Sequence, residues 1–324
     1  MKKLGEVLKI LAIIGVIIGI VGVLYWVSKG NKKPDKIVFI SKSTQSEYVF
    51  WDTVRMGAEL AAREENIELE YTGPLEEKDI AVQMNILEGK IEEGVDVILL
   101  AATDSNKLKG LVERAREEGI TVVSVDSAVE GQERIVATNN VEASSVLTRH
   151  LARLIGGQGE VIMLNFVQET STAKEREEGY DLEIDRHPGI SKLPTVYTEG
   201  TTESAYEEAK ELLTRYPDLK GIVSGNQYTT EGVCLAVEEL GLAGKVKVVG
   251  FDSSTVIVEG LEKGVVNAII VQKPFNMGYI GVKTAIDLFA NKKIDDHIDT
   301  GYKLITPDVL YLTENQKLLY PIIE

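Results

Sequence analysis

The chain has 324 residues, enough for two domains of ordinary size, and its composition of 44% hydrophobic and 27% charged residues is that of a folded globular protein. The net charge is −16, and because residues 1–36 hold seven lysines against two acidic residues, the remainder carries −21. A surface this acidic repels phosphate backbones, which argues against nucleic-acid binding.

The first predicted element is an uncharged apolar stretch over residues 10–28, close to the ~20 residues that a helix needs to cross a bilayer. Tyr25 and Trp26 stand at its far end, where aromatic rings favour the headgroup region. A cleaved signal peptide would have a shorter apolar region and a clearer cleavage site. We therefore expect an uncleaved, single-pass transmembrane anchor in the cell membrane, with the acidic domain on the extracytoplasmic side. The flanking segments are then a cytoplasmic N-terminus (1–9) and a linker (29–36).

Beyond the linker, short apolar runs alternate with charged amphipathic segments such as 54–65 and 80–93. This alternation predicts βαβ units and therefore parallel sheets covered by helices. The expected strands are 37–41, 68–72, 97–101, 121–125, 134–138, 160–165, 194–198, 221–224, 246–250 and 267–271.

Two of these runs, Val122-Val-Ser-Val-Asp126 and Val248-Val-Gly-Phe-Asp252, each close on an aspartate. Apolar runs without alternation are typical of strands buried on both faces. In parallel sheets the ligand crevice lies beyond the carboxyl ends of the strands. The pair therefore predicts two similar lobes facing one cleft, with Asp126 and Asp252 at its edge. The alternative for each aspartate is a cap on the loop or helix that follows.

The predicted fold is α/β, with two doubly wound parallel-sheet lobes joined by a multi-strand hinge. The boundary is expected near Thr138-Asn-Asn140, the helix 274–291 should return to the first lobe, and the chain should cross again near 304–312. Several crossings suit closure around a ligand. The first lobe is thus assigned residues 37–139 and 273–303, and the second lobe residues 140–272 and 304–324.

Signatures of catalysis are sparse. The run Gly156-Gly-Gln-Gly159 precedes a strand instead of following one, which is the wrong order for a phosphate or dinucleotide loop. The three histidines lie far apart, and no nucleophile elbow is present. Cys234 is the only cysteine and stands on an apolar helix face, as an inert core residue would. We therefore expect no enzyme activity, no catalytic residue, no cofactor and no metal.

Aromatic residues follow the first predicted strand in a chain that is only 6% aromatic. Tyr48, Phe50 and Trp51 lie within four residues at the expected crevice edge. Such rings can cover the apolar CH faces of a sugar. The alternative is that Phe50 or Trp51 anchors the first helix into the core.

Polar side chains end three consecutive strands of the second lobe. Asn226, Asp252 and Gln272 would bring two amides and one carboxylate to the same edge of the sheet. Donors and acceptors held in fixed geometry suit a neutral, polyhydroxylated ligand.

Five segments, in this order and spacing, carry a family resemblance: Thr103-Asp-Ser105, Val122-Val-Ser-Val-Asp126, Ser171-Thr-Ala-Lys-Glu-Arg176 with Glu178-Gly-Tyr180, Ser224-Gly-Asn226 and Val248-Val-Gly-Phe-Asp252. From about residue 37 to the C-terminus the chain resembles the type I periplasmic binding proteins of the ribose and galactose transporter class. The resemblance implies two lobes joined by three crossings, with a monosaccharide or related small molecule bound between them.

By position, the resemblance implies roles for individual residues. Phe50 and Trp51 correspond to stacking aromatics of the first lobe. Asp126 corresponds to a hydroxyl-binding aspartate, Thr138 to a polar contact near the hinge, and Lys174 stands where the family often has an arginine. The second-lobe polar contacts are Asn226, Asp252 and Gln272. The expected ligand-binding set is therefore Tyr48, Phe50, Trp51, Asp126, Thr138, Lys174, Asn226, Asp252 and Gln272.

The chain also departs from the pattern of ribose binders. Ala101-Ala102 replace an asparagine and a proline, Ser127 replaces an arginine, and Glu199-Gly-Thr-Thr202 lacks an expected aromatic ring. One face of the sugar is therefore less covered. The ligand stays open between ribose, another pentose, a hexose and a sugar-like signal.

The leading expectation is a membrane-tethered binding protein that serves an ABC transporter permease or reports to a sensor histidine kinase. One alternative is a membrane-tethered α/β enzyme acting on a sugar. The other is a transcription regulator of the lac-repressor type, which would need a helix-turn-helix where this chain has its apolar stretch.

Overall fold

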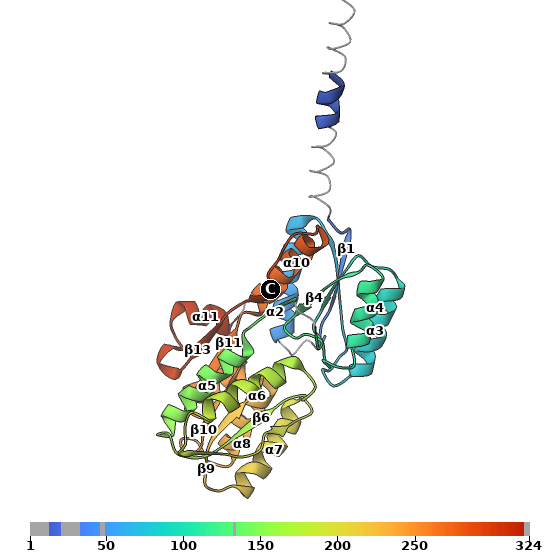
Figure 1. Ribbon diagram of the computed structural model, residues 1–324. Helices are drawn as coiled ribbons and strands as arrows, with labels where there is room; N and C mark the ends of the chain where they lie inside the picture. Colours follow the sequence, from blue (N-terminus) through green and yellow to red (C-terminus); the bar gives the residue numbers. More distant parts are fainter. Residues whose placement is uncertain (1–12, 21–32, 46–48, 132–133, 321–324) are drawn as a thin grey trace, which may run out of the picture.

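The structure is a computed structural model that describes residues 13–20, 33–45, 49–131 and 134–320. Two α/β lobes, each a sheet flanked by helices, follow one another along the long axis of the molecule (Figure 1). The first sheet has the order β12-β5-β4-β3-β1-β2. Its lobe contains β1 (Lys36–Ile40), α2 (Val49–Glu65), β2 (Glu68–Thr72), α3 (Ile80–Glu92), β3 (Val97–Leu100), α4 (Lys109–Glu117), β4 (Thr121–Val125), β5 (Ile135–Ala137), α10 (Pro274–Phe289) and β12 (His297–Asp299).

The second sheet has the order β13-β11-β10-β9-β6-β7, with β8 paired to β6. Position by position, this order matches that of the first sheet, except that β13 is antiparallel to β11 whereas β12 is parallel to β5, so β10 occupies the place that β4 has in the first lobe. The predicted two-lobe α/β fold is confirmed. This lobe contains α5 (Asn140–Leu154), β6 (Gly159–Asn165), α6 (Ser171–Ile184), β7 (Ile190–Lys192), β8 (Val196–Tyr197), α7 (Thr202–Arg215), β9 (Leu219–Ser224), α8 (Gln227–Glu239), β10 (Lys247–Phe251), α9 (Thr255–Glu262), β11 (Ala268–Gln272), β13 (Tyr302–Ile305), the 3₁₀ helix η1 (Pro307–Val309) and α11 (Thr313–Leu319).

The chain passes between the lobes after β5, between β11 and α10, and between β12 and β13. The third passage lies at residues 300–301, before the range 304–312 expected from the sequence. Gly301, with φ of +76°, permits the turn there. The Asp299 carboxylate accepts hydrogen bonds from the backbone N–H of Asn139 (3.2 Å) and of Gly301 (2.9 Å), so one side chain joins two of the three passages.

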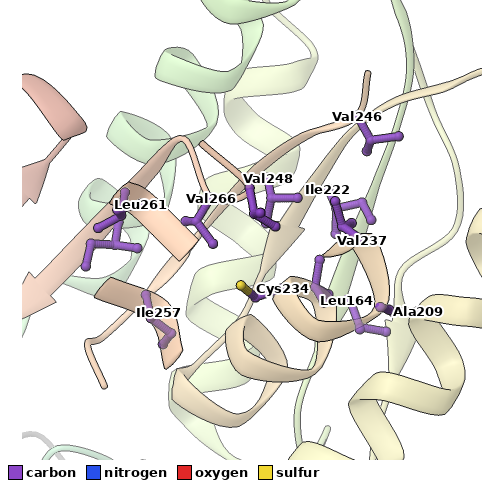
Figure 2. Packing of buried hydrophobic residues seen from close by; sticks show 14 of the residues in the cluster. Leu164, Ala209, Ile222, Cys234, Val237, Val246, Val248, Ile257, Leu261 and Val266 are labelled. Carbon is purple, nitrogen blue, oxygen red and sulfur yellow. The ribbon is translucent and has the colours of Figure 1, made fainter. Parts of the chain in front are cut away.

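Each lobe buries apolar residues on both faces of its sheet, which explains the unalternating strand patterns. Cys234 lies in the core of the second lobe among valine, leucine and isoleucine side chains (Figure 2). Its thiol is buried, and burial raises its pKa to about 11. The thiol is therefore protonated and unreactive at neutral pH, as the sequence predicted.

Helices α2 and α10 cross closely in the first lobe because a glycine of each faces the backbone of the other. A Cβ atom built on Gly57 would lie 2.0 Å from the Phe275 carbonyl oxygen, and one built on Gly278 would lie 1.9 Å from that of Val54. This crossing ties the returning helix α10 to the N-terminal helix of the lobe, next to the hinge.

Replacing Gly278 with alanine is therefore expected to destabilise the protein by about 1–3 kcal/mol, because the two helices must move apart to admit the methyl group. Chemical denaturation of the full-length chain measures the change. Gly89→Ala in α3 is the matched control: its Cβ would meet nothing within 4 Å, so the higher helix propensity of alanine should stabilise by about 0.5–1 kcal/mol. Equal stability for the two variants would contradict the close crossing.

The predicted transmembrane helix at 10–28 lies mainly outside the described residues. Of that stretch the structure describes residues 13–20, which are helical and exposed. Within the described ranges, no helix has both the length and the apolar character needed to cross a bilayer.

Candidate ligand-binding site

A cavity lies between the lobes, at the carboxyl ends of the strands of both sheets. We call it the central cavity. It is lined by Lys42, Phe50, Trp51, Glu77, Asp126, Phe166, Thr172, Arg176, Asn226, Asp252 and Gln272.

The two strand-end aspartates occupy equivalent places in the two lobes. Asp126 follows β4 and Asp252 follows β10, and both have left-handed backbone conformations, with φ of +65° and +68°. Aspartate and asparagine tolerate this conformation better than other residues with a Cβ atom. The left-handed residue turns the chain at the end of a rigid strand, and both carboxylates line the central cavity.

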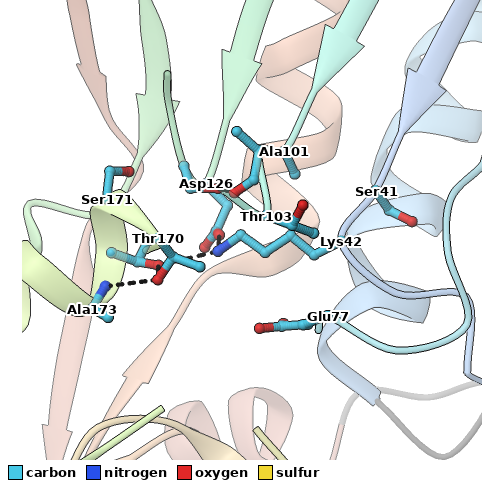
Figure 3. Close-up of polar contacts among 12 residues, drawn as sticks. Ser41, Lys42, Glu77, Ala101, Thr103, Asp126, Thr170, Ser171 and Ala173 are labelled. Atoms are coloured by element: carbon cyan, nitrogen blue, oxygen red, sulfur yellow. Dashed lines mark hydrogen bonds and ion pairs between the residues drawn. The ribbon is translucent and has the colours of Figure 1, made fainter. Parts of the chain in front are cut away.

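Lys42 follows β1 and is only 2% exposed. Its ammonium group forms an ion pair with Asp126 (2.8 Å) and donates a hydrogen bond to Thr172 Oγ1 of the second lobe (3.1 Å). Figure 3 shows the lysine side chain extending toward Asp126, with Glu77 pointing into the same space. An ammonium group has three donors, so one N–H stays available to a ligand acceptor.

Glu77 and the aromatic pair form another part of the wall. Phe50 and Trp51 meet edge to face, with ring centroids 5.1 Å apart. Trp51 Nε1 donates to Glu77 Oε1 (3.3 Å). Burial raises the pKa of the Glu77 carboxyl, and the nearby Lys42 opposes that rise. Phe50 and Trp51 also belong to the core of the first lobe, so each ring has a core face and a cavity face.

Arg176 of α6 is 2% exposed and lines the second-lobe side of the cavity. It donates to Asn140 Oδ1 (2.9 Å) and to the Gly225 carbonyl oxygen (2.6 Å). Its guanidinium lies 4.0 Å from the centroid of the Phe251 ring. These contacts fix the guanidinium as a rigid cation beside the hinge.

Asp252 lies between an amide and a cation. Gln272 Nε2 donates to its carboxylate (2.8 Å), as does the backbone N–H of Gln227. Burial raises the pKa of Asp252, while Arg176 and the hydrogen bond from Gln272 counteract the rise. Among the described residues, no partner satisfies Gln272 Oε1 or the buried Nδ2 of Asn226, which caps α8 through its own Oδ1. Unpaired buried groups of this kind are ready to bind a ligand.

Of the nine predicted ligand-binding residues, six line the central cavity: Phe50, Trp51, Asp126, Asn226, Asp252 and Gln272. Thr138 is fully buried at the hinge, and its hydroxyl has no partner within the described chain. Lys174 is half-exposed at the rim of the cleft, where it donates to Ser105 Oγ (3.0 Å). Tyr48 lies outside the described residues. The cavity residues that the sequence prediction missed are Lys42, Glu77, Phe166, Thr172 and Arg176.

Contacts between the lobes surround the cavity. The backbone N–H of Ser105 donates to the Glu169 carbonyl oxygen (2.9 Å), and that of Ala128 donates to Ser171 Oγ (3.0 Å). With the bond from Lys42 to Thr172, these contacts hold the two lobes in a closed arrangement. The lining residues are therefore buried by both lobes together.

A family model described as a periplasmic binding protein domain matches residues 37–293, which is most of the chain. The chain belongs to this family of periplasmic binding proteins. The match covers both lobes and every described residue that lines the central cavity.

Curated relatives within the family are similar over most of their length. A D-ribose/D-allose-binding protein of Pseudomonas aeruginosa is 29% identical over 289 residues, covering 85% of this chain and 89% of the relative. A ribose import binding protein of Bacillus subtilis is 27% identical, covering 86% and 90%. These relatives are sugar-binding transport proteins and not enzymes, in agreement with the absence of catalytic signatures in the sequence.

Solved structures of periplasmic binding proteins have the same fold. A carbohydrate transporter solute-binding protein of Agrobacterium radiobacter, in complex with D-arabinose, aligns with a TM-score of 0.84 at 25% identity, covering 88% of this chain and 99% of its own. A solute-binding protein of Agrobacterium vitis bound to α-D-tagatopyranose gives a TM-score of 0.82 at 28% identity, covering 88% and 99%. A sugar transporter of Clostridium phytofermentans is 33% identical, with a TM-score of 0.77, covering 85% and 99%.

Proposed function

We propose that this protein captures a neutral monosaccharide between its lobes, outside the cytoplasm, and delivers it to the permease of an ABC importer. The observation that carries the proposal is the central cavity, where three carboxyl groups, two cations and two unpaired amide atoms stand opposite an aromatic pair. Hydroxyl groups of a sugar satisfy such donors and acceptors, and its CH faces contact the rings.

The charges of the cavity support a neutral ligand. Asp126 is paired with Lys42, and Asp252 is stabilised by Arg176. Burial raises the pKa of the Glu77 carboxyl, and the cations Lys42 and Arg176 lie beside carboxyl groups of the lining, which disfavours an anionic ligand. The names of the curated relatives favour an import permease over a sensor histidine kinase as the partner.

The test is isothermal titration calorimetry on the purified full-length chain with D-ribose, D-allose, D-arabinose and D-tagatose. We expect at least one of these sugars to bind with micromolar or tighter affinity, and small-angle scattering to show that bound protein is more compact than protein without sugar. Sugar phosphates and sugar acids should bind far more weakly, because three carboxyl groups line the cavity and its two cations lie beside them. Preference for a charged sugar would contradict the proposal.

We also propose that residues 10–28 tether the protein to the cell membrane. The length of the uncharged run and the aromatic residues at its end support this anchor. Mature protein extracted from membranes should therefore begin within residues 1–9. N-terminal sequencing that finds a start after Gly30 would show that the segment is cleaved.

A further inference from the structure

A second hollow adjoins the central cavity and shares Phe50, Asp252 and Gln272 with it. This outer compartment continues between the first turn of α2, the start of α8 and the C-terminal helix α11. Thr53, Gln227 and Leu318 contribute to its wall from these three elements. A molecule in the central cavity can therefore extend past Asp252 without leaving the cleft.

The polar groups of the outer compartment are mainly acceptors. Gln227 and Gln272 are 3% and 2% exposed, and the carbonyl oxygen of each amide lacks a hydrogen-bond partner among the described residues. Their amide nitrogens are already used, by Glu231 and Asp252 respectively. The oxygens that remain require a donor, which a ligand hydroxyl supplies.

The rest of the outer compartment is apolar and nearly uncharged. Val49, Val271, Pro274 and Leu318 provide aliphatic surface, and Asp252 is the only charged side chain among the described lining residues. Aliphatic surface beside hydroxyl acceptors matches a second hydroxylated carbon unit and excludes an anionic group such as phosphate.

We infer that the site takes a glycoside, with one sugar ring in the central cavity and a hydroxylated substituent in the outer compartment. This inference rests on the proposed function and makes its ligand more specific: a monosaccharide that carries a hydroxylated substituent. Asp252 and Gln272 stand at the junction and contact both parts of the ligand.

Three ligand sets test this by calorimetry on the full-length chain: the free sugars D-ribose, D-allose and D-arabinose, both anomers of their methyl glycosides, and both anomers of their 2-hydroxyethyl glycosides. For at least one sugar, the hydroxyethyl glycoside should bind about tenfold tighter than the methyl glycoside, the scale of one hydrogen bond to a buried acceptor. The methyl glycoside lacks both the second carbon and the donor, so the Gln227→Leu variant separates loss of the hydrogen bond from loss of length.

Two variants locate the effect. Leu318→Trp fills the outer compartment and should weaken both glycosides, and its binding of the free sugar would show that it is folded. Gln227→Leu removes one acceptor and should erase the difference between hydroxyethyl and methyl glycosides. If free sugars bind and every glycoside binds more weakly, the inference is wrong and the proposed function stands. If no member of the three sets binds, the proposed function itself fails.

Discussion

Replacing Lys42 with methionine is expected to lower ligand affinity by about a hundredfold or more. The lysine is the only described cation within ion-pair distance of Asp126, and both side chains are almost fully buried in the closed arrangement. Removing one partner of a buried ion pair costs about 3–5 kcal/mol, because the other charge is left uncompensated. The closed form carries this cost, whereas in an opened cleft water solvates Asp126.

Calorimetry with the identified sugar measures the loss, and small-angle scattering should show that Lys42→Met stays open at ligand concentrations that close the parent protein. The double variant Lys42→Met/Asp126→Asn should recover part of the affinity, because a neutral amide needs no counter-charge. Lys210→Met, which removes an exposed ion pair with Glu239 far from the cleft, is the matched control and should bind normally. Full affinity in Lys42→Met would show that the ammonium group has no role in closure.

Asp252→Ala is expected to reduce affinity by about 2–4 kcal/mol, the worth of about two charge-assisted hydrogen bonds less some rescue by water. The structure adds two costs to the loss of ligand contacts. The Gln272 amide loses its acceptor, and an alanine must adopt a left-handed backbone with φ near +68°. Asp252→Asn avoids the backbone cost and keeps one acceptor oxygen, so it should lose less.

The Asp252→Asn substitution should also change how the stability of the protein depends on pH. Burial raises the pKa of Asp252 in the folded protein, so this group's contribution to stability is fully present below its unfolded pKa and is lost as the pH rises through the folded value. Asparagine has no such titration. In sugar-saturated protein, which holds the closed arrangement, the melting temperature of the Asp252→Asn variant relative to the parent should therefore increase from acidic to neutral pH. A difference that is constant with pH would place Asp252 in water, outside the closed cavity.

The strand-end rule predicted much of this site from the sequence, because polar side chains that follow buried strands gather at one edge of a sheet. Asp126, Asn226, Asp252 and Gln272 all follow it. Lys42 obeys the same rule after β1 and could have been found in this way. Lys42 was not predicted, because its counter-ion Asp126 is distant in the sequence.

The strand-end rule could not predict Arg176 or Glu77, because Arg176 lies on a helix and Glu77 in a loop. Lys174 and Arg176 share the first turns of α6, but at 3.6 residues per turn two positions differ by about 200° around the helix. Lys174 therefore faces the rim and Arg176 the cavity. Sequence position alone did not fix that rotation, which depends on how α6 packs against α5. Glu77 lies in the loop between β2 and α3, where no periodicity indicates a direction.

The shared topology of the two sheets has an electrostatic consequence for capture. Each lobe brings one carboxylate from the equivalent strand and one cation to neutralise it, Asp126 with Lys42 and Asp252 with Arg176. Each of the two aspartates therefore has a cation within its own lobe before the cleft closes. For the neutral sugar proposed as ligand, we therefore expect an affinity that depends little on ionic strength, although the domain around the cleft is strongly acidic. The pairing of charges within each lobe is the feature that would keep binding constant as the salt concentration changes.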